Sequence, residues 1–294
     1  LVANGITTVY HAISFAGPEL GLRHPRTASE VIRTILRLQD ELSARHKIHI
    51  RYECSDPDSL MLIRQLLESG AVSVLSFMNH APGQGQFPED NDYIKYLVLT
   101  YSKTEREARN MLKRKREALA GAGDRVRYLA EAGRRHRTFL ACHDLEDPGA
   151  VERWKSLGVT LAEFPLNLQT AQACRAHGLR TLFGAPNIVR GESSGSGVRA
   201  MDAIRADAAD AICSDYLPEA LLPSLQIIAG NSRLPFARAC HLLTRTPADL
   251  SQMPDLGRLE PGALADLLLL RQENDKWVLE ETWVEGSCRM RFGS

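Results

Sequence analysis

The stretch Val72-Ser-Val-Leu-Ser-Phe-Met78, followed at once by Asn79-His80, decides the fold of this chain. Seven residues without a charge predict a strand that is buried on both faces, as the strands of a parallel sheet are. The histidine comes where that strand ends, and ligands of parallel sheets bind at the carboxyl ends of the strands. The same pattern recurs in the predicted strands Ile48–Glu53, Thr138–Cys142 (followed by His143), Val159–Glu163 and Ala211–Ser214 (followed by Asp215).

Helical stretches separate these strands and two further ones, Ile6–Tyr10 and Thr181–Gly184. A capping box predicts one helix, an Asp-Pro pair predicts a second, and a long charged stretch with a glycine-rich break predicts a third. The helices run from Thr27-Ala-Ser-Glu30 to Arg45, from Asp56-Pro57 to Gly70, and over 104–137 with a break at Gly121-Ala-Gly123. Strands that alternate with helices predict parallel βαβ units and an α/β fold.

The units number seven, one short of a closed (β/α)8 TIM barrel. In a barrel the polar strand ends would converge on one mouth, where the chemistry of that fold lies. A doubly wound open sheet is the alternative, but no GxGxxG follows the first strand. We therefore expect a barrel that lacks its first βα unit.

The sequence pattern changes at about Gly257, and three short strands are predicted one after another beyond that point. They are predicted at Leu267–Leu270, Trp277–Val284 and Cys288–Phe292. Three strands leave a sheet face uncovered, so they resemble part of a small β-sandwich. We expect two domains, a barrel over 1–256 and the C-terminal strands of a small β-domain over 257–294.

Composition excludes several classes of protein. The chain has 294 residues, 36 Lys plus Arg against 36 Asp plus Glu, and 44% hydrophobic residues. Zero formal charge predicts neither a nucleic-acid nor a membrane partner, and no apolar run approaches the roughly 18 residues of a membrane helix. Six cysteines without a CxxC pair predict reduced thiols in a cytoplasmic protein. Oligomeric state is left open, a homo-oligomer included.

The polar strand ends predict a metal site. Glu53, His80, His143 and Asp215 offer imidazole and carboxylate ligands, which suit Zn²⁺, with Mg²⁺ or Mn²⁺ as alternatives. Asp144 could orient an imidazole or act separately. A bound ion of this kind supports hydrolysis. The competing interpretations are structural: Glu53 paired with Arg51 inside the fold, and histidines bonded to backbone.

The segment Gly184-Ala-Pro-Asn-Ile-Val-Arg-Gly191 leads into a Gly/Ser stretch and then a helix from Val198. Loop amides together with Asn187, Arg190 and Gly191 predict a phosphate or polar-substrate site, because a guanidinium grips phosphate bidentately. A flexible linker is the alternative. The basic runs Lys113–Arg116 and Arg134–Arg137 are predicted to be solvated helix faces.

These segments resemble the amidohydrolase superfamily. The segment Gly257-Arg-Leu-Glu-Pro-Gly-Ala-Leu-Ala-Asp266 is typical of it, and the segments around Gly184–Gly191, His80–Gln84, His143-Asp144 and Ser214-Asp215 resemble its alpha-D-ribose 1-methylphosphonate 5-triphosphate diphosphatase branch. The resemblance implies a phosphorylated ribose substrate, a 5-phosphate and pyrophosphate as products, and a place in carbon–phosphorus lyase metabolism. It implies Asp215 and His143 as catalytic residues, with Gln84 at the substrate.

The resemblance fails at the front of the chain. The family has an H-x-D metal motif on its first barrel strand, and this chain starts after that point, which agrees with the missing unit. Glu163 stands where many relatives have a histidine, so the resemblance assigns it no role. Two rival functions remain: a related amidohydrolase that acts on a C–N bond, and a truncated, non-catalytic remnant.

Overall fold

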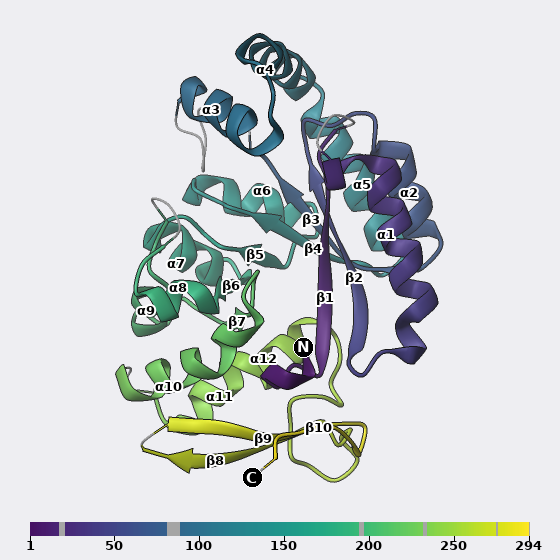
Figure 1. Ribbon diagram of the computed structural model, residues 1–294. Helices are drawn as coiled ribbons and strands as arrows, with labels where there is room; N and C mark the ends of the chain where they lie inside the picture. The colour runs from purple at the N-terminus through teal and green to yellow at the C-terminus, as the bar shows by residue number, and fades with distance from the viewer. Residues whose placement is uncertain (18–20, 81–88, 194–196, 232–233, 275, 294) are drawn as a thin grey trace. The chain divides into compact units, whose positions relative to one another are not determined.

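Seven strands form one sheet in the computed structural model, which describes residues 1–17, 21–80, 89–193, 197–231, 234–274 and 276–293. Neighbouring strands follow chain order, and the pairs β2–β3, β3–β4 and β6–β7 are parallel (Figure 1). This confirms the α/β class and the seven βα units. The strands are β1 Thr8–Phe15, β2 Arg45–Glu53, β3 Val72–Met78, β4 Phe139–His143, β5 Leu161–Glu163, β6 Arg180–Gly184 and β7 Ala211–Cys213.

Helices connect these strands. They are α1 Pro25–Leu38, α2 Leu60–Glu68, α3 Asp90–Tyr101, α4 Glu105–Leu119, α5 Ala122–Arg135, α6 Val151–Ser156, α7 Leu168–Ala176, α8 Ala185–Arg190, α9 Ala200–Arg205, α10 Leu221–Asn231, α11 Phe236–Leu243 and α12 Arg245–Leu250. Short 3-10 turns lie at Val2–Asn4, Gly21–Arg23, Gln39–Glu41, Pro148–Ala150 and Pro218–Ala220. Among the helices in the described ranges, none has the length and apolar character that crossing a bilayer requires.

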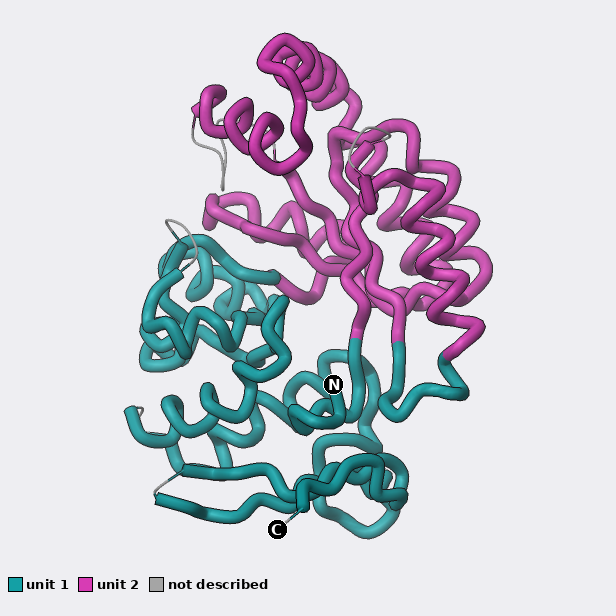
Figure 2. Tube along the Cα trace, viewed as in Figure 1, with its two compact units in different colours: residues 1–9, 39–46, 163–294 teal, residues 10–38, 47–162 magenta. Residues whose placement is uncertain are grey.

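The chain divides into two compact units (Figure 2). Unit 1 comprises 1–9, 39–46 and 163–294, and unit 2 comprises 10–38 and 47–162. The C-terminal strands β8 Leu267–Glu273, β9 Lys276–Val284 and β10 Ser287–Arg291 form an antiparallel sheet in the order β10-β9-β8 within unit 1. The predicted division at 256/257 stays a prediction.

Strand β2 in unit 2 has one apolar and one polar face, because successive side chains of a strand point to opposite sides. Ile48, Ile50 and Tyr52 are almost fully buried on one face. The other face carries His49, Arg51 and Glu53, as the sequence predicts. His49 is buried too, and its Nε2 lies 2.6 Å from Ser76 Oγ on β3. A polar face packed inside the fold is the setting in which a site can form.

An ion pair in unit 1 explains the aspartate of the superfamily segment. The Arg45 guanidinium, at the start of β2, donates to Asp266 Oδ2 at 2.9 Å and to Asp266 Oδ1 at 3.2 Å. Asp266 also accepts from the Glu285 amide at 3.0 Å, and its side chain is 5% exposed. This aspartate therefore links the start of a barrel strand to the small sheet.

Two predicted helix boundaries are wrong. The helix expected from Thr27 to Arg45 begins at Pro25 and ends at Leu38; a 3-10 turn follows at Gln39–Glu41, and Arg45 starts β2, where it pairs with Asp266. Asp56 does not cap a helix directly: its carboxylate accepts from the Asp58 amide at 3.0 Å and from the Ser59 hydroxyl, and α2 begins only at Leu60.

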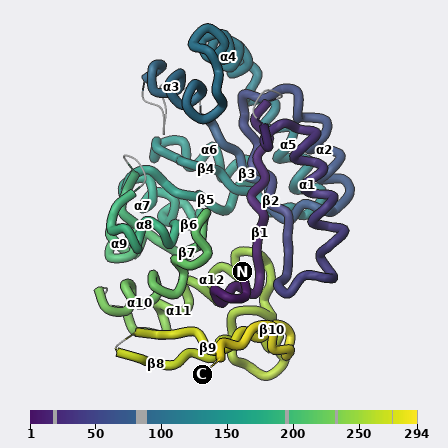
Figure 3. Tube along the Cα trace, viewed as in Figure 1, coloured from purple at the N-terminus to yellow at the C-terminus, as the bar shows by residue number. Residues whose placement is uncertain are grey.

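Other differences lie in β1 and in the long charged stretch. Strand β1 starts at Thr8 and continues to Phe15, beyond the predicted end at Tyr10. The break near Gly121 is confirmed, since α4 ends at Leu119 and α5 begins at Ala122. Helix α3, which the sequence did not reveal, packs beside α4 (Figure 3).

Candidate active site

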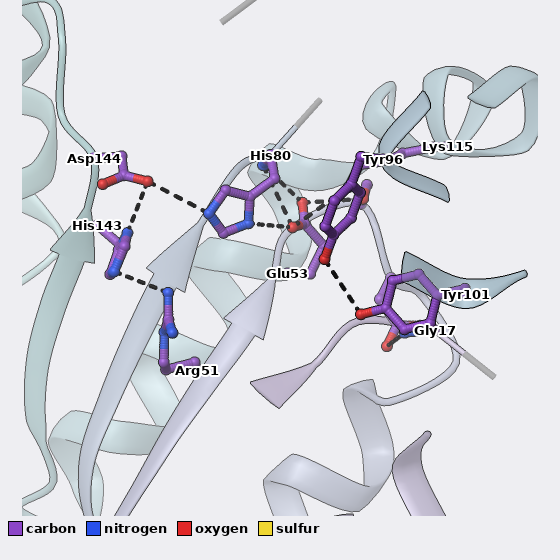
Figure 4. A network of polar contacts seen from close by, with 11 residues as sticks. Gly17, Arg51, Glu53, His80, Tyr96, Tyr101, Lys115, His143 and Asp144 are labelled. Atoms are coloured by element: carbon purple, nitrogen blue, oxygen red, sulfur yellow. Dashed lines mark hydrogen bonds and ion pairs between the residues drawn. The ribbon is translucent and has the colours of Figure 1, made fainter. Parts of the chain in front are cut away.

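Three of the predicted site residues lie together in unit 2 (Figure 4). His80 Nδ1 is 3.0 Å from Glu53 Oε2, and the rings of His80 and His143 lie edge to face with centroids 5.9 Å apart. Asp144 lies between the two rings: its Oδ2 is 3.4 Å from His80 Nε2 and 3.1 Å from His143 Nδ1. The cluster is therefore two imidazoles flanked by two carboxylates.

The parallel strands bring these residues together. Glu53 is the last residue of β2, His143 is the last residue of β4, and His80 follows β3 by two residues. Because the strands are parallel neighbours, their carboxyl ends lie at one edge of the sheet. Asp144 has a φ of 55°, and this left-handed conformation comes directly after the end of β4.

The same backbone conformation occurs after two other strands. Phe164, directly after β5, has a φ of 54°, and Asp215, two residues after β7, has a φ of 51°. Positive φ is uncommon for residues other than glycine and gathers at functional sites. Six further non-glycine residues of the described chain share this conformation at the ends of other helices and strands, so the site is assigned from its side chains and not from this feature.

Lys115 corrects the prediction that the basic run on α4 is solvated. Its side chain is 12% exposed, and its Nζ lies 3.4 Å from Glu53 Oε2 and 5.2 Å from the centre of the Tyr93 ring. The prediction holds for Lys113, whose side chain is 78% exposed. A sequence signal existed: buried Ala108 and Leu112 precede Lys115 by seven and three residues, a helical spacing that puts all three on one face.

Burial and neighbouring charges shift the pKa values of this cluster. Burial alone would raise the pKa of Glu53, but Lys115 and His80 outweigh it and lower the pKa to about 2. Burial would likewise raise the pKa of Asp144, and His143 and His80 lower it instead. Burial would lower the pKa of His80, but Asp144 and Glu53 raise it. Both carboxylates are therefore ionised at neutral pH.

Arg51 contacts His143, and Glu53 is satisfied by Lys115 and His80 instead. Arg51 Nη2 lies 2.9 Å from His143 Nε2. Because a guanidinium can only donate, His143 Nε2 accepts and its proton is on Nδ1, toward Asp144. Among the described residues, Arg51 Nε is buried without a hydrogen-bond partner. This is a donor that an acceptor on a ligand could satisfy.

The cluster fits a divalent metal in its donor set. His80, His143 and Asp144 each offer one ligand atom, and these atoms lie within 4.8 Å of one another. Two imidazoles and a carboxylate are ligands that Zn²⁺ prefers. Binding through His143 Nδ1 would release the proton on that atom, as coordination by histidine requires a neutral, unprotonated nitrogen.

Apart from Gln84, the remaining predicted residues belong to unit 1, so their convergence with the histidines stays a prediction. Asp215 packs over Gly184, where an added Cβ would lie 3.3 Å from Asp215 Oδ2. Glu163 is buried at the end of β5. Gln84 lies outside the described residues.

Residues 185–190 form the short helix α8, where the sequence suggested a loop, and Gly191 ends it with a φ of 79°. The Asn187 amide is used within the fold, since it accepts from the Ala200 amide at 2.8 Å and donates to the Val198 carbonyl at 3.2 Å. Arg190 donates to the Tyr216 hydroxyl.

Comparison with known proteins decides the family. No family model matches the chain. The alpha-D-ribose 1-methylphosphonate 5-triphosphate diphosphatase of Escherichia coli (strain K12) is 31% identical over 294 residues, which cover 97% of this chain and 77% of that protein. This chain belongs to that diphosphatase family. As a member of the family, it is a hydrolase.

Several solved structures have a fold similar to that of this chain. N-acetylglucosamine-6-phosphate deacetylase from Pasteurella multocida has a TM-score of 0.60 at 11% identity and covers 98% of this chain and 77% of its own. D-hydantoinase from a Bacillus sp. has a TM-score of 0.54 at 10% identity and covers 99% of this chain and 82% of its own. Aminofutalosine deaminase from Helicobacter pylori has a TM-score of 0.53 at 14% identity and covers 96% of this chain and 68% of its own. The predicted resemblance to the diphosphatase family is confirmed by the Escherichia coli protein, and these structures confirm the fold.

Proposed function

We propose that this chain is a metal-dependent diphosphatase that hydrolyses alpha-D-ribose 1-methylphosphonate 5-triphosphate to the 5-phosphate and pyrophosphate. The similarity to the Escherichia coli diphosphatase supports the substrate. The observation that carries the metal dependence is the His80–Asp144–His143 cluster, which gathers a Zn²⁺-type donor set at the carboxyl edge of the sheet.

His80, His143 and Asp144 would hold the divalent ion, with Zn²⁺ as the first candidate and Mg²⁺ or Mn²⁺ as alternatives. Such an ion supplies Lewis acidity toward a phosphoryl oxygen and makes a water nucleophilic at neutral pH. Glu53 accepts from His80 Nδ1 at 3.0 Å and so orients the ring with its Nε2 toward Asp144, the role of an outer carboxylate. Glu53 was predicted as a direct ligand, and this proposal gives it the orienting role instead.

The cationic side chains of the site stabilise charge on the phosphates. Lys115 is a buried ammonium beside the cluster, and Arg51 has a buried donor with no acceptor among the described residues. Arg190 is the phosphate-binding residue that we propose in unit 1, held by Tyr216. Hydrogen bonds from charged donors to phosphate oxygens strengthen as negative charge develops there.

The reaction is attack by water on the phosphorus nearest the sugar. The new bond joins the water oxygen to that phosphorus, and the bond from the phosphorus to the oxygen of the leaving pyrophosphate breaks. We assign the water proton to Asp215, whose carboxylate follows the end of β7. This proposal does not use the catalytic role predicted for His143, because His143 Nδ1 is the atom that we assign to the metal and its Nε2 faces Arg51.

The test measures metal content and pyrophosphate release from the ribose triphosphate. We expect His143→Asn and Asp144→Asn to lose bound metal and to release pyrophosphate at least about a hundredfold more slowly. The control is His136→Asn, because His136 is exposed at the end of α5. Orthophosphate as the only product would reject attack at the phosphorus nearest the sugar.

Two outcomes would favour the rival functions. Release of ammonia or a new carboxylate from amide substrates, without pyrophosphate release, would favour an amidohydrolase that acts on a C–N bond. Wild-type protein that neither binds metal nor turns over any substrate would favour a non-catalytic role.

A further inference from the structure

A cavity of about 450 Å³ lies in unit 1 at the amino ends of β6 and β7. Arg180, the first residue of β6, and Asp210, just before β7, line one side of it. Helices α7, α11 and α12 supply the other basic side chains, Arg175, Arg238, His241 and Arg245 (Figure 1). Gly184 and Asp215 lie at the opposite, carboxyl ends of the same strands, so this cavity is separate from the residues we assign to catalysis.

The carboxylates of the cavity are already neutralised. Asp210 accepts from Arg180 Nη1 at 2.8 Å and from the Thr181 amide at 2.9 Å. Asp207 pairs with Arg175 at 2.8 Å. Asp249, the third carboxylate on the wall, pairs with Arg258, which stands outside the cavity lining.

Two of the arginines that line the cavity have no hydrogen-bonded carboxylate among the described residues. Arg238 is exposed, and its guanidinium makes no hydrogen bond or ion pair with the part of the chain that the structure describes. Arg245 has only distant carboxylates, Asp249 at 3.8 Å and Glu260 at 3.9 Å, beyond hydrogen-bond length. The cavity therefore carries excess positive charge.

The basic side chains come from two consecutive helices. Arg238 and His241 are three residues apart on α11, a spacing that places them on the same side of that helix, and Arg245 is the first residue of α12. Apolar Ile204 and Leu242 line the cavity beside them. Most of the lining is polar or charged, which suits a charged ligand rather than an apolar one.

We propose that this cavity binds a small anion that carries one or two phosphate groups. Guanidinium forks match the oxygens of a phosphate group, and two forks without a hydrogen-bonded carboxylate in the described part of the chain, Arg238 and Arg245, suit such an anion. The volume lies in the range of small-ligand pockets. Free pyrophosphate and a phosphorylated sugar share this chemistry, and the experiment separates them. The proposal does not depend on the catalytic function given above.

The test titrates the full chain, kept metal-free with a chelator, with inorganic pyrophosphate and separately with ribose 5-phosphate by calorimetry. We expect Arg238→Gln and Arg245→Gln each to weaken binding about tenfold, since a charge-assisted hydrogen bond contributes about that factor. Arg238→Lys should lose part of the affinity, because it keeps the charge without the fork. Arg271→Gln is the control, an exposed arginine on β8 that pairs with Glu273 and Glu280.

Each outcome bears on the proposal. Weaker binding in the cavity variants, with the control unchanged, supports the site, and the ligand with the lower Kd identifies the preferred anion. Equal affinity in all variants would overturn the proposal, as it would place the anion elsewhere, for example at Arg190. No heat of binding at millimolar ligand would overturn it as well. Melting curves check folding, and Arg238→Gln keeps the test valid because this side chain has no ion pair to lose in the described part of the chain.

Discussion

Replacing Lys115 by methionine tests whether the basic residue on α4 belongs to the site. Methionine keeps the length and apolar stem of the side chain but removes the ammonium 3.4 Å from Glu53 Oε2. Glu53 is 2% exposed and ionised, so the variant leaves a buried carboxylate with one positive partner fewer. We expect the metal-free protein to lose stability.

The magnitude follows from the distance. Two unit charges 3.4 Å apart at an effective dielectric constant of about 20 attract by roughly 5 kcal/mol. Part of this is offset, because the lysine no longer has to be desolvated and His80 remains 3.0 Å from the same carboxylate. We therefore expect a loss of about 2 to 3 kcal/mol, or about 4 to 8 °C in melting midpoint for a chain of this size.

The assay compares melting midpoints and urea midpoints of wild type, Lys115→Met and Lys113→Met in the presence of a chelator. Lys113 is the matched control: it lies on the same helix, its side chain is 78% exposed, and its partner Glu117 is 3.9 Å away. An exposed pair of this kind contributes less than about 1 kcal/mol. Equal midpoints for the two variants would refute the argument that Lys115 is a buried partner of Glu53.

Three further predictions concern the family segments. Gly257→Ala should cost about 3 kcal/mol or more in unfolding free energy, because φ is 69° and the new Cβ would lie 2.6 Å from backbone atoms; Gly262→Ala, with a φ of 91° and open space, should cost only about 1 kcal/mol. Asp266→Asn should lower the free energy of unfolding by about 2 kcal/mol at pH 7. Because Arg45 lowers the pKa of Asp266 against the effect of burial, the difference between variant and wild type should shrink as the pH falls below about 4 and vanish below the pKa of Asp266 in the folded protein. A difference that stays constant down to pH 2 would contradict the ion pair. Arg190→Lys should weaken binding of the ribose triphosphate about tenfold in a titration, and an unchanged Kd would remove this residue from the phosphate site.

Local sequence determined the elements and the edge where the site lies. Strand β3 could be predicted to the residue, because a run of seven uncharged residues between turn signals leaves little choice of structure. The positions of Glu53, His80 and His143 followed from the same pattern, since parallel neighbours bring their carboxyl ends to one edge. The ends of helices were harder to predict, as the helix expected to reach Arg45 shows. Helix propensity depends on local sequence, and it does not include a contact such as the one between Arg45 and Asp266.

Tertiary structure alone decided which charged residues became buried and with whom they paired. Lys115 lies in a basic run that resembles a solvated surface, and only the packing of α4 brings its ammonium to Glu53. Arg45 and Asp266 are 221 residues apart, and no local pattern relates them. The spacing of hydrophobic residues in the sequence indicates which face of a helix or strand is apolar, because residues a few positions apart lie on the same face. Pairing of buried charges depends on distances between elements, and those exist only once the chain is folded.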